Sequence, residues 1–550
     1  MSRVMAALSV LVLAGAAGVA APAAPPDRSD PGNLRREVSI LASDALRGRA
    51  PWDGGYRLAA NHVEQVLRRL GLHPAGGGFQ HPVPLEVTRP VAGSCRLELR
   101  RFGREETFEL GSHMLLLAGG EETWLGSWHP VVFAGYGIVA PEFDWNDFRG
   151  IDVEGAVVVA VAGEPPSSDD AFFGGAAPTV HAAPETKLRQ AASRGAAGLL
   201  LVHDPLGVEP GLSWERLRRD LSRPLVALPY NTPRIFAAMV HRRVLGALAT
   251  DALYDTGEIR SMLARNAVRP FRIPAEIRFR GRFVTRGIRS PNVVALLPGS
   301  DPVLARQVVV VSAHLDHLGV GEPVDGDPVY NGAVDNALGC AGVLELARLL
   351  AAGARPARTV LFLFTTGEEE GLLGSRSFLT DPPVPFGDLV ANVNVDGLAF
   401  MERFRSVVVV GGALSTLGPT VGRVARRLGY TVEDAPPELA MAESFARSDQ
   451  WAFAEAGIPS VLVSEGLSWK YSSREAAVRQ NLAWMARVHH TPFDDPDQPL
   501  DFEAAAAHVD LLAAVVRAIA DAPERPRWNH GSVQEYRSLL NRASGGVVWP

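Results

Sequence analysis

Residues 308–317 read Val-Val-Val-Val-Ser-Ala-His-Leu-Asp-His, an apolar run that passes directly into polar side chains. Four further apolar runs follow, separated by helical segments: residues 360–364, 390–395, 407–410 and 461–463. Continuous apolar runs of this length are typical of strands that are buried on both faces. Because these strands alternate with helices, the sequence predicts an α/β fold with a mainly parallel mixed sheet flanked by helices.

The polar residues that follow these runs are nearly all of types that bind metal ions. They are His314, Asp316 and His317 after the first run, Asp335 in a turn, Glu368 and Glu369 after the second run, and Asp396 after the third. Open α/β sheets bind ligands beyond the carboxyl ends of their strands. Each residue alone has an ordinary explanation, such as a hydrogen-bonded loop histidine or a solvated helix start. Together they predict a metal site, because clustered like charges are unfavourable unless a cation compensates them.

Five short motifs resemble those of the M28 family of zinc peptidases and occur in that family's order. They are Ala-His-Leu-Asp-His at 313–317, Ala-Val-Asp-Asn at 333–336, Gly-Glu-Glu-Glu-Gly at 367–371, Val-Asp-Gly at 395–397 and His-Thr-Pro-Phe-Asp at 490–494. The resemblance covers residues from about 34 to 85 and from 277 to 522. It implies a zinc exopeptidase-like fold and hydrolysis of peptide bonds.

The resemblance also implies a site for two Zn²⁺ ions. Asp335 would bridge both ions, His314 and Asp396 would complete one site, and Glu369 and His490 would complete the other. Mixed histidine and carboxylate ligands with an open position are the catalytic pattern for zinc. Two ions ~3.5–4 Å apart can stabilise both the nucleophile and the developing oxyanion.

Two further carboxylates are expected to act in catalysis. Glu368 directly precedes a predicted ligand, so it can reach the metal-bridging water without binding a metal ion, take the proton of that water and pass it to the leaving amine. Asp316 lies two residues after His314. It is similar to the family's carboxylate that accepts the other imidazole N–H and fixes the tautomer of the ring.

Three positions near these motifs are ambiguous. His489 stands beside His490, and only His490 has the His-Thr-x-x-Asp spacing to Asp494, which makes His490 the predicted ligand. His317 is expected to be a solvated loop residue. Gln450 stands where the family often has histidine in a Ser-Asp-His stretch, which leaves the details of the substrate pocket open.

The N-terminus predicts export from the cytoplasm. Arg3 precedes an apolar run at residues 4–19 and a stretch of small residues, the order of a secretory signal peptide, which we assign to residues 1–21. The alternative is a single membrane anchor, but the apolar run is shorter than the ~20 residues that a membrane span needs. The mature chain is therefore expected to be periplasmic or extracellular, with no stable membrane span.

The rest of the chain divides into three parts. A peptidase domain is predicted at residues 30–85 and 273–522, with a helix at 58–70. Residues 86–272 read as an inserted, strand-rich module that is similar to a protease-associated (PA) domain, through Phe-Ala-Gly-Tyr-Gly at 133–137 and a helix–strand unit at 187–202. Residues 523–550 form a polar tail that is expected to be peripheral.

Composition limits the classes of partner. The chain has 550 residues and a formal net charge of -7, and no run rich in Lys or Arg stands out. This pattern gives no electrostatic footprint for nucleic acid or an anionic membrane and fits a peptide substrate better. Only two cysteines occur, Cys95 and Cys340, and we expect no disulfide between them. Cys340 is predicted to be a small core residue at the start of a helix.

An aminopeptidase that releases N-terminal residues is the preferred function. A carboxypeptidase or dipeptidase of the same family is the main alternative, since nothing in the sequence identifies the group that would bind a free amine or a free carboxylate. A single-zinc glutaminyl cyclase and a non-catalytic receptor-like scaffold are further alternatives. The presence of all five ligands and Glu368 argues against both. The inserted module is expected to cover the cleft and to limit substrate length.

Overall fold

The computed structural model describes residues 28–118, 125–167, 169, 172–173, 179–203, 213–230, 235–439 and 444–531. The predicted signal peptide and the end of the predicted tail, from residue 532 onward, lie outside these ranges. Within these ranges, we find no helix with the length and apolar character that a membrane crossing requires.

The first of two large sheets contains the predicted apolar runs. Its order is β11-β2-β14-β18-β15-β19-β22-β20-β21, with β1 beside β14. The four central strands are parallel: β18 (Thr359–Thr365), β15 (Val308–His314), β19 (Leu389–Asn394) and β22 (Ser460–Glu465). The outer strands are β20 (Ser406–Val410), β21 (Thr431–Glu433), β14 (Phe283–Leu297), β2 (Gln80–Pro90), β11 (Leu225–Ala227) and β1 (His73–Pro74). The predicted mixed α/β fold is confirmed.

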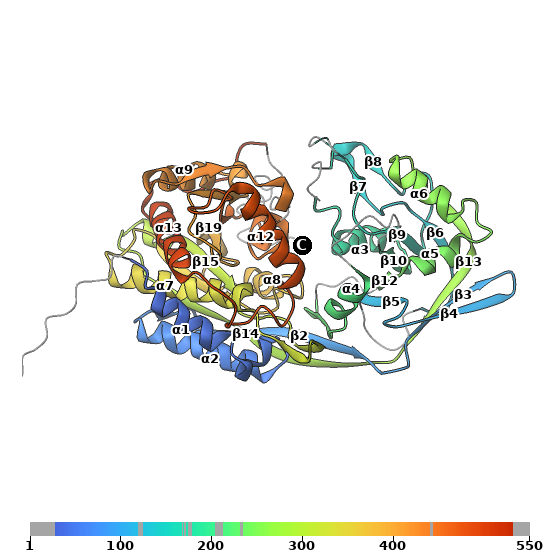
Figure 1. Ribbon diagram of the computed structural model, residues 1–550, viewed down its shortest axis with the longest axis horizontal. Coiled ribbons are helices and arrows are strands. Elements are labelled where there is room, and N and C mark those ends of the chain that lie inside the picture. The colour runs from blue at the N-terminus through green and yellow to red at the C-terminus, as the bar shows by residue number, and fades with distance from the viewer. Residues whose placement is uncertain are drawn as a thin grey trace, which may run out of the picture.

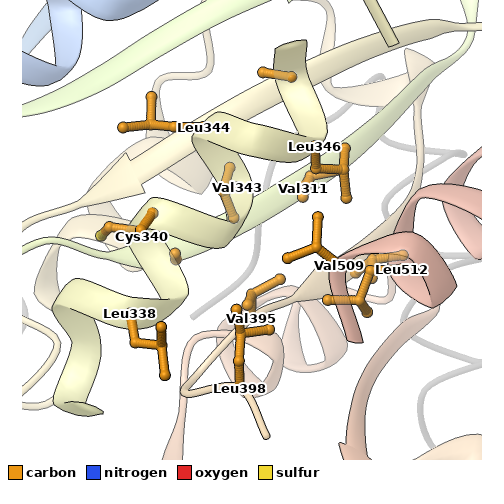
Figure 2. Close-up of a cluster of buried hydrophobic side chains, with 14 of the residues drawn as sticks. Val311, Leu338, Cys340, Val343, Leu344, Leu346, Val395, Leu398, Val509 and Leu512 are labelled. Atoms are coloured by element: carbon orange, nitrogen blue, oxygen red, sulfur yellow. The ribbon is translucent and has the colours of Figure 1, made fainter. Parts of the chain in front are cut away.

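Helices cover both faces of this sheet because alternate strand side chains point to opposite sides. Val309 and Val311 of β15 join the core under α1 (Pro31–Leu41), α2 (Gly54–Arg69), α7 (Gly339–Ala352), α9 (Leu417–Arg427) and α13 (Phe502–Asp521). Val308 and Val310 face α8 (Leu373–Thr380) and α11 (Gln450–Glu455). Figure 2 shows side chains of α7 and α13 gathered around Val311.

Cys340 lies in this core near the start of α7 (Figure 2). It is fully buried, and its Sγ donates to the carbonyl oxygen of His314 at 3.0 Å. Cys95 is also buried, and both thiols are free. The predictions of a core cysteine and of no disulfide are confirmed.

The second sheet has eight strands in the order β4-β3-β13-β6-β9-β10-β12-β5. Its strands are β3 (Arg96–Arg101), β4 (Arg104–Glu109), β5 (Met114–Ala118), β6 (Leu125–Phe133), β9 (Val157–Val161), β10 (Gly198–Val202), β12 (Phe236–Val240) and β13 (Phe271–Arg280). The helices of this part are α3 (Pro184–Ala192), α4 (Trp214–Asp220), α5 (Arg242–Ala249) and α6 (Thr256–Ala264). Separate apolar clusters line its two faces, so it has its own core.

Residues 91–282, between β2 and β14, are called the second module below, and the remainder the first module. The two strands pair with each other antiparallel from Gln80–Val293 to Pro90–Phe283, and Figure 1 shows them running from one module toward the other. The change from one sheet to the other falls after Pro90 and again after Arg280, and β11, which lies between these points, returns to pair with β2 of the first sheet. The domain boundaries and the likeness to a PA domain stay predictions from the sequence.

The chain after α13 is not wholly peripheral. Trp528 is buried, and its Nε1 donates to the carbonyl oxygen of Gly457 at 2.9 Å. The ring packs against Val408, Val410 and Leu462 of the first sheet. The expectation of a peripheral tail is therefore wrong at this residue, because a tryptophan can bury its ring while its N–H keeps a partner.

Candidate metal centre

The predicted ligands converge at the carboxyl ends of three neighbouring parallel strands. His314 is the last residue of β15, Glu368 and Glu369 follow β18, and Asp396 follows β19. Because β18 and β19 flank β15 on either side, these side chains meet at one edge of the sheet. Two loops add the remaining groups: Asp335 comes from the segment that leads into α7, and His490 follows α12 (Arg474–Arg487).

Asp335 lies between two sets of candidate ligands. One carboxylate oxygen, Oδ1, is 3.2 Å from Nε2 of His314. That same Nε2 is 3.1 Å from Oδ1 of Asp396. The other oxygen of Asp335, Oδ2, is 3.2 Å from Nε2 of His490, which in turn is 3.3 Å from Oε2 of Glu369. Each oxygen of Asp335 therefore faces one of the two predicted ligand pairs.

His489 and His490 both reach Asp335. Nε2 of His489 lies 3.3 Å from Oδ2 of Asp335, and the two imidazole rings stack with centroids 3.9 Å apart. Only His490 also approaches Glu369. The geometry thus favours His490 over His489 as the ligand that would share an ion with Glu369.

His317 is not the solvated loop residue that the sequence suggested. Its side chain is fully buried, and its Nδ1 is 2.7 Å from Oε1 of Glu369. Its Nε2 has no hydrogen-bond partner among the described residues. The prediction is wrong because the turn after β18 brings Glu369 against the histidine, a contact between residues 52 positions apart. His317 therefore occupies one oxygen of Glu369 while the other faces His490.

Glu368 is nearly buried at the same edge. Burial raises the pKa of its carboxyl group well above the ordinary value, and the carboxylates of Asp396 and Glu369 add to this effect against the opposing influence of His314. A carboxyl group with a raised pKa takes up a proton more readily, which is what a general base near neutral pH requires.

Asp316 has a different partner from the one expected. Nδ1 of His314 lies 3.2 Å from the backbone carbonyl oxygen of Asp316, and not against its carboxylate. The carboxylate instead accepts hydrogen bonds from the backbone N–H groups of Glu368, at 3.2 Å, and Glu369, at 3.3 Å. The backbone of Asp316 orients the imidazole, and its side chain holds the turn that carries the two glutamates.

Two further residues fix the loops around the site. The carboxylate of Asp494 accepts from the N–H of Val334 and from the N–H of Asp335. Arg49 is buried and donates to the carbonyl oxygens of Leu41, Leu315, Asn331 and Gly332. Asp494 belongs to the last predicted motif, but nothing local in the sequence marks Arg49, whose partners in the site lie more than 260 residues away.

A buried polar layer lies beneath the ligands. The amide of Asn394 donates to Oγ of Ser448 and to Oε1 of Gln450, at 2.8 Å and 2.7 Å. Asp449 accepts hydrogen bonds from the hydroxyl groups of Thr365 and Ser375. Gln450, which departs from the family pattern, is therefore a buried member of this network and does not contact the candidate ligands through these bonds.

The donor set fits zinc. Ligand atoms of Asp335, His489 and His490 lie within 4.8 Å of one another, and so do those of His314, Asp335 and Glu369. Burial lowers the pKa of His490, but Glu369 and Asp335 outweigh burial and raise it to about 10. Burial alone would raise the pKa of Asp335, but its contacts with the histidines lower it well below the ordinary value. The carboxylates thus favour a positive charge at His490, which a bound cation could supply instead, and imidazole with carboxylate is a ligand set that zinc prefers.

Comparisons with known proteins find similar sequences and folds among peptidases. Residues 292–516 match the model of peptidase family M28. A protein of Arthroderma benhamiae named "Probable leucine aminopeptidase" is 27% identical over 237 residues, which are 42% of this chain and 58% of that protein. One of Pyrenophora teres f. teres named "Probable zinc metalloprotease" is 26% identical over 246 residues, 43% of this chain and 50% of that protein. The chain thus spans less than two thirds of either relative.

A solved structure of an aminopeptidase from Aneurinibacillus sp. strain AM-1 has a similar fold. Its TM-score is 0.52, and the match covers 91% of this chain and 98% of that one at 17% identity, which bears on the fold alone. The family match, by contrast, spans all five motifs completely. The likeness to peptidase family M28 thus covers residues 292–516, which hold all five candidate metal ligands.

Proposed function

We propose that this protein is an exported dizinc aminopeptidase that releases N-terminal residues from peptides. The observation that carries the proposal is the position of Asp335, whose two carboxylate oxygens face two separate pairs of candidate ligands. We assign His314 and Asp396 to one ion, Glu369 and His490 to the other, and Asp335 to both. A single-zinc site would not need a carboxylate placed between two such pairs.

When bound, zinc would lower the pKa of water and polarise the carbonyl group of the substrate. The chain itself supplies the proton transfers. Glu368, held at the ligand edge by the hydrogen bond from its N–H to Asp316, takes the proton of the attacking water and gives it to the leaving amine. Its raised pKa suits the second transfer, because a more basic carboxylate holds the proton until the amine needs it.

The choice of an aminopeptidase is supported by the names of relatives such as the probable leucine aminopeptidase. The match with this chain covers less than two thirds of that relative's length. A carboxypeptidase or dipeptidase would use the same ligands and the same base, and differs only in which terminus of the peptide is bound. Retention of the complete ligand set with Glu368 beside it weighs against the glutaminyl cyclase and receptor-like alternatives.

A panel of three substrate types distinguishes these activities: chromogenic aminoacyl anilides, N-terminally blocked dipeptides and C-terminally blocked dipeptides. Each substrate is incubated with the protein, and the zinc content of the same protein is measured in parallel. We expect two zinc ions per chain and hydrolysis only of substrates with a free N-terminus. Hydrolysis that requires a free C-terminus would assign a carboxypeptidase. Full zinc content without turnover would support the scaffold, and one ion with cyclisation of an N-terminal glutamine would support the cyclase.

The second module is proposed to limit substrate length. Its α4 and the residues just after it contact the first module beside the candidate metal centre, through bonds from Arg216 to the carbonyl oxygen of His489 and from Arg223 to Glu370. A long peptide would have to pass this contact. Hydrolysis rates for dipeptides and for peptides of about 20 residues, compared between the intact chain and one without the second module, test the idea, and an unchanged length preference contradicts it.

Export is proposed from the sequence of residues 1–21 alone, which lie outside the described structure. Expression of the complete chain in a bacterial host, followed by fractionation and N-terminal sequencing, tests it. We expect protein outside the cytoplasm that begins near residue 22.

A further inference from the structure

Helix α4 of the second module contacts the end of the helix that leads to His490. The guanidinium group of Arg216 donates to three backbone carbonyl oxygens of the first module: those of Met485 at 3.2 Å, Ala486 at 3.0 Å and His489 at 3.1 Å. Figure 1 shows α4 and α12 on the facing sides of the two modules. The side chain of Arg216 is only 16% exposed, so this contact is largely shielded from solvent.

Two of these carbonyl groups lie in the last turn of α12, which ends at Arg487. The final carbonyl groups of an α-helix lack partners within the helix, and the C-terminal end carries partial negative charge. Arg216 supplies hydrogen-bond donors and a positive charge to that end. The second module therefore caps the helix that immediately precedes the two histidines.

The third carbonyl group belongs to the peptide bond between His489 and His490. His490 has a φ of 57°, in the left-handed region that residues other than glycine rarely adopt. Such a conformation persists only when the surroundings hold it. Because φ is the rotation of His490 against this same peptide group, the bond from Arg216 to the carbonyl oxygen of His489 helps to set the direction of the imidazole.

A second arginine from the same segment reaches the residue that follows the other ligand of this pair. Nη1 of Arg223 lies 3.2 Å from Oε1 of Glu370, the residue after Glu369, and the two side chains are 15% and 11% exposed. Nε of Arg223 donates to the carbonyl oxygen of Asp220 at the end of α4. One short segment of the second module thus contacts both loops that carry the His490 and Glu369 ligands.

We propose that residues 214–223 of the second module, through Arg216 and Arg223, hold the His490 and Glu369 loops in the conformation that binds metal. Retention of the ion assigned to Asp335, Glu369 and His490 then depends on a module that contributes no ligand. The proposal rests on the dizinc site proposed above. Arg216 and Arg223 are positioning residues, because they act through the backbone and through Glu370.

The rate of zinc release tests the proposal without a turnover assay. Full-length wild type and variants are loaded with zinc, and release to a chromogenic chelator is followed together with the zinc content per chain. Arg216→Ala should release one of its two ions at least about tenfold faster than wild type, in line with the effect of groups that orient metal ligands. Arg216→Lys should fall between the two, since a lysine ammonium cannot span three carbonyl groups.

Arg218→Ala is the matched control. Arg218 lies on the same helix and also crosses to the first module, where it pairs with Glu322 at 2.7 Å, but Glu322 adjoins no candidate ligand. This variant should release zinc at the wild-type rate. Arg223→Gln provides a second test of the positioning role should Arg216→Ala fold poorly, which thermal unfolding of the metal-free proteins would reveal.

When wild type keeps its zinc, two results would overturn this proposal alone. One is wild-type release rates in Arg216→Ala and Arg223→Gln. The other is equal acceleration in Arg218→Ala, which would show a general effect of loosening the contact between the modules. Wild-type protein that keeps no zinc after loading would overturn the dizinc site itself and this proposal with it. Zinc retained by wild type but lost quickly from Arg216→Ala supports both.

Discussion

The carboxylate of Asp494 accepts a hydrogen bond from the backbone N–H of Asp335 at 3.0 Å. Its other oxygen accepts from the N–H of Val334 at 2.9 Å, so both oxygens are committed to the loop that carries Asp335. Asp494 therefore fixes the backbone from which the proposed bridging carboxylate projects. Because its own oxygens accept these bonds, we assign Asp494 no metal ion.

Asp494→Asn should weaken zinc binding about 10–100-fold, the usual effect of losing a group that orients a ligand. The asparagine NH₂ group cannot accept, so one of the two backbone N–H groups would face a donor. Competition with a chelator of known affinity measures the change. Asp495→Asn is the control, because Asp495 accepts from Asp497 and Gln498 instead. Equal zinc affinity in Asp494→Asn and wild type would contradict the positioning role.

His490→Ala should bind one zinc ion fewer than wild type, and His489→Ala should keep two. Both imidazoles reach Asp335, but only His490 is also within 3.3 Å of Glu369. Metal analysis after removal of free zinc measures the stoichiometry of each variant. Loss of an ion from His489→Ala with full occupancy in His490→Ala would reverse the assignment.

Glu368→Gln should lower kcat about 10²–10⁴-fold, the range for removal of a general base, with the zinc content unchanged. Glutamine keeps the size of the side chain but cannot take the proton of water. Single-turnover hydrolysis of an aminoacyl anilide, with zinc measured on the same sample, checks both parts. Glu370→Gln is the comparison: it removes the partner of Arg223, so it should release zinc faster while kcat per bound zinc stays near the wild-type value. Wild-type kcat in Glu368→Gln would remove this residue from the mechanism.

The sequence was informative wherever a local pattern determines the structure. Runs of valine and leucine predict strands because only a sheet covered on both faces buries them fully. His314 and Asp396 could be predicted to meet because they follow neighbouring parallel strands. The order of adjacent strands also explains why Glu369 joins them from β18.

Other features depend on contacts between distant segments, which no local pattern reveals. His317 reads as a loop residue because the sequence does not show that Glu369 lies against it. Arg49 is an isolated arginine until the fold brings the carbonyl groups of Leu315 and Gly332 to it. Arg216 lies in a module without candidate ligands, and its contact with His489 depends on how the two modules pack.

Acid should destabilise the protein between about pH 6.5 and pH 4 through His508. Its Nδ1 accepts from the N–H of Ala399, so Nε2 carries the hydrogen and faces the carbonyl oxygen of Val463. Burial lowers the pKa of His508 to about 4, against a smaller opposing effect of the bond to Val463. The unfolded chain, with a histidine pKa near 6.5, binds more protons in this window, so stability falls as the pH drops through it.

The loss should approach about 3 kcal/mol at pH 4, since each pKa unit corresponds to ~1.4 kcal/mol. Urea unfolding of the metal-free protein at several pH values measures it. His508→Gln should remove this contribution and flatten the profile over the same window. An equally steep decline in His508→Gln would show that other groups cause the acid sensitivity.

The paired strands β2 and β14 have a mechanical consequence. β2 contributes 11 residues to an unbroken ladder, which at ~3.4 Å per residue makes a ribbon about 37 Å long. A two-stranded ribbon bends across its broad face more easily than within its plane. We therefore expect the second module to move by bending of this ribbon and not by free rotation about it. β11, which follows Arg223, pairs with the middle of β2 at Glu86–Thr88. Bending of the ribbon would therefore shift Arg216 and Arg223, the two arginines that contact the proposed metal-binding loops.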